Sequence, residues 1–437
     1  MSLKETVLNQ CERAKEAALQ IAAVNTDVKN IVLDELADDL KKNSKQIIAA
    51  NKKDLSANKK LPAAMLKRLE INDAKIKEMC DMVRSVAKQE DPTGKTISEM
   101  ELDEELTLQK ITVPIGVIGC IFESRPEVVV QIAALAIKSG NAVLLKGGKE
   151  ALNSNLALVE VIRTSIEDNQ GMPADTVQLL ETREEVKQVL KMDDFIDLLI
   201  PRGSNELVKY IQSNTKIPVL GHADGICHVY VDKHADINKA MKIAVDSKTQ
   251  YAAVCNAMEN LVVHKDAAQE FIPKITNTFL KMGVEVRADS KSFNIIKKNK
   301  TIPLREIHKA TEKDWKTEYN EEIISIKVVD TINEAVDFIN KHGSHHTDAI
   351  VTEEKAEAQM FINFVDSSSV VHNASTRFAD GFRYGLGAEV GISTNKVHAR
   401  GPVGLEGLVI TKFILRGIDH IVDDYAKGKK KFTHKKK

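Results

Sequence analysis

Residues 113–146, VPIGVIGCIFESRPEVVVQIAALAIKSGNAVLLK, indicate which class of fold this chain adopts. Residues 113–122 form a near-continuous apolar run, which is typical of a strand buried on both faces of a sheet. A helical segment follows over 126–138 and ends at Ser139-Gly140, where glycine suits the position after a helix. A second strand is expected over 142–146. This order of strand, helix and strand predicts a parallel sheet.

The same alternation continues along the chain and predicts a doubly wound α/β domain, followed by a second α/β unit that begins near residue 233. Helices are expected over 153–167, 183–191, 205–213 and 236–249. Strands are expected over 177–180, 195–201, 217–220, 227–231, 323–329 and 349–352.

The flanking segments have other patterns. Residues 1–91 contain no glycine, and their apolar residues recur every three or four positions, so a group of amphipathic helices is expected. Residues 96–114 alternate in part between polar and apolar side chains, as in an exposed hairpin. The Lys-rich end, residues 427–437, is expected to be a disordered, solvated tail, and binding to polyanions is the less favoured alternative.

The composition argues against several classes of partner. The chain has 437 residues and a formal net charge of -1, which favours neither nucleic acid nor a membrane surface. No apolar run approaches the roughly 18 residues that span a bilayer, and the N-terminus lacks an apolar signal core. The 5 cysteines are scattered and never spaced C-x-x-C. We therefore expect free thiols and a cytoplasmic protein without nucleic-acid or membrane partners.

Two strand ends offer a place for a nucleotide. The first ends in Lys146 and Gly147, and the second runs through Gly203 and Ser204 into a helix. The free N–H groups and positive dipole end of a helix suit a phosphate, although ordinary strand-to-helix turns are the alternative. The G-x-G-x-x-G fingerprint is absent. Basic Lys146 and Lys149, in place of an early acidic residue, favour NADP(H) over NAD.

Cys255 is the candidate nucleophile among the 5 cysteines. The others lie in predicted helices or strand runs, where cysteine behaves as a small hydrophobe. Cys255 instead follows the predicted helix 236–249 and precedes polar Asn256. A thiol near exposed N–H groups at the end of an element can be activated, while a buried structural cysteine is the open alternative.

Two polar segments of the second half contain candidate ligands. Residues 378–408 are rich in glycine and include Arg383, His398 and Arg400, which would suit an anionic substrate; a long surface connection is the alternative. The stretch HGSHH at 342–346 has neither H-E-x-x-H spacing nor a cysteine partner. No metal site is therefore expected.

Several strings together carry a resemblance to a known family. They are ITVPIGVIGCIFESRPEV, IKSGNAVLLKGGKEA, LIPRGSNELV, VCNAMENLVVH, GSHHTDAIVT, NASTRFADGFRYGLGAEVGIST and HARGPVGLEGL. From about residue 5 to about residue 420, the chain resembles the gamma-glutamyl phosphate reductases, which are glutamate-5-semialdehyde dehydrogenases of the aldehyde dehydrogenase superfamily.

The resemblance implies an activity: NADPH-dependent reduction of L-glutamate 5-phosphate to L-glutamate 5-semialdehyde and phosphate, the second step of proline biosynthesis from glutamate. Cys255 matches the nucleophile that would accept the acyl group as a thioester. Its backbone N–H and the side chain of Asn256 are the candidates for binding the oxyanion. Lys146 would face the adenosine ribose, and Gly203 and Ser204 would lie at the pyrophosphate.

The substrate's phosphate and carboxylate need cationic partners. Arg125, His398 and Arg400 are the candidates, with Arg377 and Arg383 behind them. For each arginine a structural ion pair is the alternative. Because the acyl phosphate is unstable, a glutamate 5-kinase is a candidate partner.

The implied fold is aldehyde-dehydrogenase-like, with two doubly wound α/β domains and a small β element for oligomerisation, so a homo-oligomer is expected. The expected parts are an NADP-binding domain (1–95 and 114–232), a catalytic domain (233–400), an oligomerisation element (96–113 and 401–420) and a basic tail (421–437).

The likeness to the wider superfamily is incomplete at one position. Oxidising aldehyde dehydrogenases have a glutamate that activates water to hydrolyse the thioester, whereas Gly221 and His222 stand there in this chain. Slow hydrolysis suits a reductase. The alternatives are an NAD(P)-dependent dehydrogenase of another aldehyde, a reductase of another acyl phosphate, and a non-catalytic binding protein with the same fold.

Overall fold

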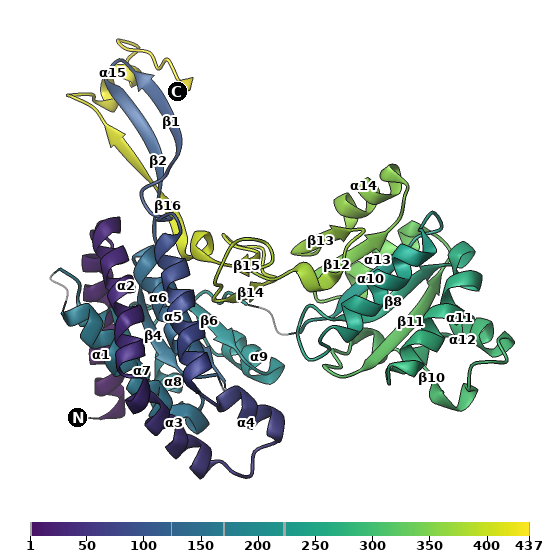
Figure 1. Ribbon diagram of the computed structural model, residues 1–437. Helices are drawn as coiled ribbons and strands as arrows, with labels where there is room; N and C mark the ends of the chain where they lie inside the picture. The colour runs from purple at the N-terminus through teal and green to yellow at the C-terminus, as the bar shows by residue number, and fades with distance from the viewer. Residues whose placement is uncertain (1, 124, 169–170, 222–223, 437) are drawn as a thin grey trace. The chain divides into compact units, whose positions relative to one another are not determined.

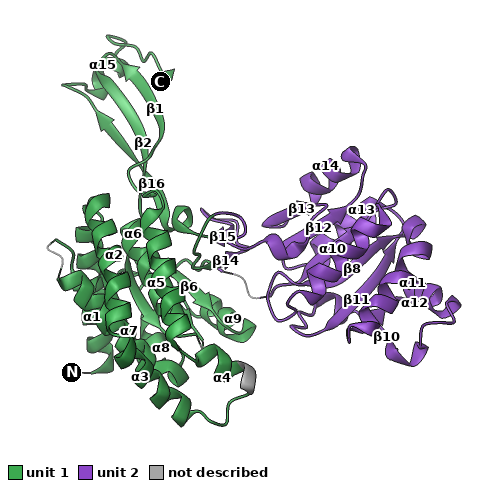
Figure 2. Cartoon of the chain, viewed as in Figure 1, with its two compact units in different colours: residues 1–220, 386–391, 403–437 green, residues 221–385, 392–402 purple. Residues whose placement is uncertain are grey.

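The computed structural model describes residues 2–123, 125–168, 171–221 and 224–436 (Figure 1). The chain forms two compact units, coloured separately in Figure 2. The first unit contains Met1–Leu220, Leu386–Gly391 and Val403–Lys437, and the second contains Gly221–Gly385 and Ile392–Pro402.

The first unit is built on a parallel sheet with the strand order β5-β4-β3-β6. From β3 the chain proceeds through β4 to β5 and then returns to the other side of β3 to form β6, so the direction of winding changes between β3 and β6. The strands are β3 (Val117–Phe122), β4 (Ala142–Lys146), β5 (Val177–Leu179) and β6 (Leu198–Arg202). The connecting helices are α6 (Glu127–Ser139), α7 (Leu152–Glu167), α8 (Arg183–Val189) and α9 (Asn205–Ser213). The predicted α/β fold class is confirmed.

The N-terminal segment is helical, as predicted. It forms α1 (Leu3–Ile21), α2 (Thr26–Lys42), α3 (Ser44–Ala57), α4 (Ala63–Leu69) and α5 (Asp73–Lys88). Buried Val7, Cys11 and Ala14 of α1 pack against Leu144 of β4 in one hydrophobic cluster. The amphipathic face of α1 thus covers part of the sheet.

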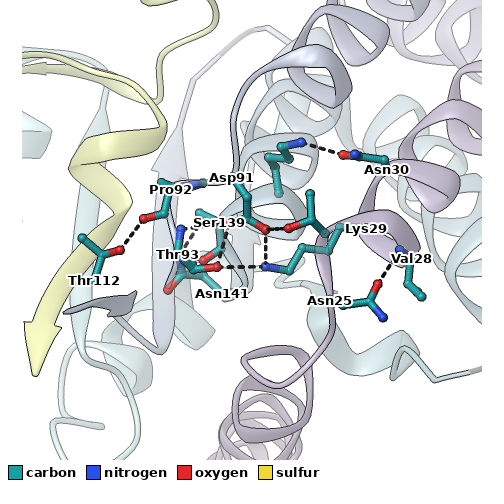
Figure 3. Close-up of polar contacts among 12 residues, drawn as sticks. Asn25, Val28, Lys29, Asn30, Asp91, Pro92, Thr93, Thr112, Ser139 and Asn141 are labelled. Carbon is teal, nitrogen blue, oxygen red and sulfur yellow. Dashed lines mark hydrogen bonds and ion pairs between the residues drawn. The ribbon is translucent and has the colours of Figure 1, made fainter. Parts of the chain in front are cut away.

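A buried ion pair links α2 to the segment that follows α5 (Figure 3). Lys29 Nζ lies 3.0 Å from Asp91 Oδ2, with the Lys29 side chain 1% and the Asp91 side chain 9% exposed. Asp91 also accepts hydrogen bonds from the Thr26 hydroxyl and from the N–H and hydroxyl of Thr93. Burial opposes ionisation of Asp91, but these hydrogen bonds outweigh it and hold its pKa below the usual value.

We expect Asp91→Asn to destabilise the protein by about 3–5 kcal/mol, because it leaves the buried Lys29 charge without an opposite charge. Since the pKa of Asp91 is lowered on folding, its contribution is complete above the ordinary carboxyl pKa of about 4 and is lost as the pH falls below it. Denaturant unfolding at pH 7 and pH 3 measures both effects. Asp38→Asn, which breaks an exposed pair with Arg84, is the control and should cost less than about 1 kcal/mol. An equal loss in both variants would contradict this account.

The second unit contains a larger parallel sheet with the order β10-β9-β11-β8-β7-β12-β13. Its strands are β7 (Cys227–Val231), β8 (Met258–His264), β9 (Glu285–Ala288), β10 (Ile307–Lys309), β11 (Ile323–Val329), β12 (Thr347–Val351) and β13 (Ser369–His372). Its helices are α10 (Ile237–Thr249), α11 (Lys265–Lys281), α12 (Ser290–Lys298), α13 (Ile332–His342) and α14 (Lys355–Phe364).

Near the boundary between the units, one predicted strand forms but lies in the second unit, and another predicted strand does not form. Residues 227–231 were expected in the first domain, but β7 pairs with β8 and β12 of the second unit. Residues 217–220 were expected to be a strand, but they make only an isolated bridge between Val219 and Leu199. The compact units divide after Leu220, whereas the predicted division lay after residue 232.

The predicted hairpin forms a small antiparallel sheet. It consists of β1 (Thr96–Asp103) and β2 (Leu106–Pro114), and β16 (Val409–Arg416) pairs with β2. The C-terminal tail is not a disordered end, because β17 (Lys435–Lys436) pairs with β1 after the short helix α15 (Val422–Ala426). The tail is held where Thr433 N–H donates to the Leu102 carbonyl. The role of this sheet in oligomerisation stays a prediction.

Candidate active site

Cys255 lies in a short connection between α10 and β8, which we call the Cys255 turn and define as residues 250–257. Its side chain is half-buried, whereas the other four cysteines are buried, and all five are free. Burial raises the pKa of the Cys120 thiol to about 12 and that of Cys11 to about 12. The thiol predicted to react is therefore the accessible one.

The backbone of the Cys255 turn is packed tightly against the segment that enters β7. A Cβ added to Gly225 would lie 2.5 Å from Cys255 Cα and 2.6 Å from Cys255 Cβ, so only glycine fits there without displacing the turn. The Cys227 thiol donates to the Cys255 carbonyl at 3.2 Å. These contacts fix the position of Cys255 from one side.

Asn256 and Arg377 fix the turn from another side. Asn256 is buried, and its Nδ2 donates to the Ala379 carbonyl at 2.9 Å. Arg377 Nε donates to Gln250 Oε1, at the start of the Cys255 turn, at 3.0 Å. The structure therefore brings Cys255, Asn256 and Arg377 together.

Arg377 lies close enough to Cys255 for an ionised thiol to affect the pKa of the arginine. Arg377 is 7% exposed, and burial lowers its pKa, as does the neighbouring charge of Arg383. The negative charge of an ionised Cys255 would raise the pKa of Arg377 and so oppose both effects. Arg383 Nη1 donates to the Arg377 carbonyl at 2.9 Å and so supports the same segment. Sequence reasoning placed both arginines behind other candidates, because no local pattern indicates which arginine packs beside a thiol more than 120 positions away.

The other predicted substrate residues lie in different surroundings. Arg400 is held by Asp366, with Nη1 at 3.0 Å from Oδ1 and Nη2 donating to the carbonyl at 3.0 Å. His398 is exposed on the same segment. Arg125 is exposed in the first unit, directly before α6. Arg400 thus forms the structural ion pair that was the alternative to a role in substrate binding. Asp366 also forms an ion pair with Lys396.

The candidate cofactor residues lie at the carboxyl ends of β4 and β6 in the first unit. Lys146 is the last residue of β4, is 6% exposed, and donates to the carbonyl of the next residue, Gly147. Burial lowers the pKa of Lys146, and nearby Glu150 opposes that shift. A buried ammonium therefore lies at the carboxyl end of β4.

Ser204 is the N-cap residue of α9, and its backbone N–H already donates a hydrogen bond to an anion. The acceptor is the Glu123 carboxylate, at 2.9 Å. A Cβ added to Gly203 would lie 2.7 Å from Glu123 Oε2, so glycine allows this close approach. Glu123 follows β3, and the site lies where the sheet changes its winding direction, which is the usual place for a nucleotide. Sequence reasoning did not identify Glu123, since the contact spans 81 positions.

Three further predictions concern features that the chain is expected to lack: a glutamate that activates water, a metal site and a membrane-spanning helix. Gly221 is part of the second unit, where its N–H donates to Asn395 Oδ1 at 3.0 Å, whereas His222 lies outside the described residues. Within the described ranges, no group of three or more His, Cys, Asp or Glu side chains is arranged to hold a metal ion. No helix in the described part of the chain combines the length and apolar character needed to cross a membrane.

Comparison with known proteins agrees with the geometry. A model of the aldehyde dehydrogenase family matches residues 2–322. A gamma-glutamyl phosphate reductase from Methanococcoides burtonii is 54% identical over 429 residues, which cover 97% of this chain and 95% of that protein. The crystal structure of a gamma-glutamyl phosphate reductase from Thermotoga maritima superposes with a TM-score of 0.91 at 38% identity, covering 95% of this chain and 99% of that one.

A more distant structure shares the fold alone. It is the glyceraldehyde-3-phosphate dehydrogenase GapN from Methanocaldococcus jannaschii complexed with NADP, with a TM-score of 0.66 and 15% identity over 95% of each chain. The match to the family model and the identity to the archaeal relative indicate the same family, and the half-buried Cys255 is consistent with it. The chain belongs to the aldehyde dehydrogenase family, and within it to the gamma-glutamyl phosphate reductases.

Proposed function

We propose that this oxidoreductase reduces L-glutamate 5-phosphate to L-glutamate 5-semialdehyde with NADPH, releasing phosphate, as the second step of proline biosynthesis from glutamate. The placement of Cys255 carries the proposal: among the cysteines it is the one that is not buried, and a buried arginine lies beside it. The name of the 54% identical relative supports the choice of substrate.

The proposed chemistry at Cys255 is covalent. The thiolate attacks the acyl carbon of the substrate, the bond from that carbon to the phosphate oxygen breaks, and phosphate leaves with the electron pair. The product of this step is a thioester on Cys255, which is a good acceptor of hydride. Buried Arg377 is proposed to stabilise the thiolate before attack, because a cation beside a thiol favours its ionised form.

Donors near Cys255 stabilise the negative oxygen of the tetrahedral intermediate. The candidates are the Cys255 backbone N–H and the Asn256 Nδ2 group, which has two hydrogens and uses one for the Ala379 carbonyl. Arg125, His398 and Arg400 are proposed for the phosphate and carboxylate of the substrate. Because Arg400 forms an ion pair with Asp366, the substrate would either share the guanidinium with Asp366 or replace Asp366 as its partner.

Aldehyde dehydrogenases use a nicotinamide cofactor, and when bound it supplies the hydride that reduces the thioester. Lys146, Gly147, Gly203 and Ser204 are proposed to hold it. The site fits an anionic group, because the Ser204 N–H at the start of α9 already donates a hydrogen bond to the Glu123 carboxylate. A bound pyrophosphate would replace that carboxylate. Buried, basic Lys146 favours NADPH over NADH.

Lys146→Met should raise the KM for NADPH roughly tenfold to a hundredfold, because a charged hydrogen bond contributes about 1.5–3 kcal/mol. The KM for NADH should change much less if Lys146 binds the extra phosphate. Steady-state kinetics with both cofactors test this. Lys187→Met, an exposed lysine of α8, is the control and should leave both values unchanged. An unaltered KM for NADPH in Lys146→Met would remove Lys146 from the cofactor site.

The substrate assignment is tested by supplying freshly generated acyl phosphates and following NADPH consumption. L-glutamate 5-phosphate should be reduced at least about a hundredfold more efficiently than aspartyl phosphate or an N-acetylated glutamyl phosphate, since a polar site left unpaired strongly rejects an analogue. A preference for one of the analogues would instead support a reductase of another acyl phosphate.

The cellular setting is also proposed. The free cysteines suit the cytoplasm. A homo-oligomer assembled through the β1–β2–β16 sheet is proposed because Phe413 and Leu415 of β16 are 66% and 57% exposed. A glutamate 5-kinase is a proposed partner, since the acyl phosphate is unstable. Size measurement in solution and co-purification test these two proposals.

A further inference from the structure

A fully buried ion pair borders the Cys255 turn and has no part in the chemistry proposed above. Lys248 Nζ lies 2.7 Å from Glu259 Oε2, and both side chains are 0% exposed. Lys248 belongs to the last turn of α10, and Glu259 is the second residue of β8. The two charges therefore join the element that ends before Cys255 to the element that begins after it.

Such a pair contributes little net free energy to the stability of a core. Replacing a buried ion pair by apolar side chains of similar volume is often neutral or stabilising, and in some proteins such a pair specifies a geometry instead. Around this pair the geometry is well defined: the Asn320 N–H donates to Glu259 Oε1, and the Tyr319 ring lies 6.0 Å from Lys248 Nζ. Burial raises the pKa of Glu259 to about 7, against the opposing effect of Lys248.

The end of α10 also holds the segment that carries Arg377. Ser247, next to Lys248, contacts the Ser375 hydroxyl at 3.1 Å and accepts the N–H of Thr376 at 3.2 Å. A shift of this helix end would thus move Arg377 as well as the Cys255 turn. The end of α10 therefore helps to fix the positions of both Cys255 and Arg377.

We infer that Lys248 and Glu259 are positioning residues that set the place of the Cys255 thiol by fixing both ends of the Cys255 turn. This inference rests on the proposed role of Cys255 as nucleophile. Neither residue touches substrate or cofactor. Their effect reaches the reaction through the distance and direction of the thiol.

The test uses variants that separate stability from thiol placement. Lys248→Met and Glu259→Leu, each alone, leave one buried charge unpaired and should lower the denaturant midpoint. The double variant Lys248→Met/Glu259→Leu replaces the pair by apolar side chains and should recover most of the midpoint. Its kcat should nevertheless stay at least about tenfold below the wild type, because a misplacement near 1 Å can cost a hundredfold. The KM for NADPH should not change.

Alkylation of Cys255 by iodoacetamide, followed by mass spectrometry of the modified peptide, gives a second measurement that does not depend on the enzymatic reaction. We expect its rate in the double variant to differ from the wild type by at least about threefold, since exposure and surrounding charge set thiol reactivity. The volume-preserving variant Glu259→Gln should show the same change in kcat and alkylation, in smaller measure. Lys29→Met, which breaks the buried pair with Asp91 in the first unit, should lower stability without changing either.

Two results would overturn the inference. One is a double variant with kcat and alkylation rate both within about twofold of the wild type at any stability. The other is an equal effect of Lys29→Met, which would mean that loss of stability alone explains the change. If instead Cys255→Ser keeps full activity, the proposed function fails, while the alkylation rates still report whether the pair positions the thiol.

Discussion

Cys255→Ser should lower kcat for acyl phosphate reduction by roughly 10³-fold or more, because loss of a covalent nucleophile removes the route through an acyl-enzyme. A serine hydroxyl is hardly ionised near neutral pH, and the arginine beside Cys255 can stabilise a thiolate but accept no proton. Steady-state kinetics give kcat, and circular dichroism with denaturant unfolding shows whether the fold is intact. The isosteric change should leave stability within about 1 kcal/mol of the wild type.

Cys80→Ser is the matched control, since Cys80 is 4% exposed on α5 and its thiol has a pKa raised mainly by burial. It should cost some stability and leave kcat unchanged. The account of the nucleophile would be contradicted by a Cys255→Ser enzyme with more than about a tenth of the wild-type kcat, because no covalent route tolerates that substitution so well.

Gly225→Ala should reduce kcat about a hundredfold, because a methyl group at this position would overlap the backbone of Cys255. The turn cannot retreat freely: Asn256 is bonded to Ala379, and Gln250 to Arg377. Overpacking of this kind also costs about 1–3 kcal/mol of stability. The kinetic loss should therefore exceed what partial unfolding explains, and alkylation of Cys255 should change in parallel.

Gly404→Ala offers a comparison at a buried glycine with ordinary space around it. Its added Cβ would find its nearest neighbour, the Ala388 carbonyl, at 3.4 Å, which requires little movement. This variant should keep kcat within about threefold of the wild type, as expected of a tolerated substitution. Gly225→Ala behaving in the same way would mean that the contact with Cys255 does not set the position of the thiol.

Local sequence patterns were sufficient to predict those helices and strands that depend on contacts between residues close in sequence. The apolar run that contains β3, the glycine that ends α6 and the helical spacing of α1 to α5 are local features. The structure has all three, although β3 begins at Val117 because the first two residues of the run end β2. Membership of a sheet is not local. Residues 227–231 were recognised as a strand but assigned to the wrong unit, since that depends on pairing with β8 and β12. The Lys-rich β17 has no apolar pattern and exists through its pairing with β1.

The candidate site shows the same division. Cys255 and the Gly203-Ser204 turn could be selected as candidates because an unusual residue at the end of an element is visible in one segment. Gly225, Arg377 and Glu123 were not given their roles, because each acts through a contact with a residue far away in the sequence. The place of Arg377 near the Cys255 turn therefore became apparent only from packing.

The central claim is that phosphate, and not water, exchanges with the acyl group on Cys255. The reverse reaction tests it most directly: supply pyrroline-5-carboxylate in equilibrium with glutamate semialdehyde, add NADP, and follow NADPH absorbance with and without inorganic phosphate. We predict NADPH formation that requires phosphate and disappears in Cys255→Ser. NADPH formation at the same rate without phosphate would mean that water is the acceptor, and the chain would then be a hydrolytic aldehyde dehydrogenase.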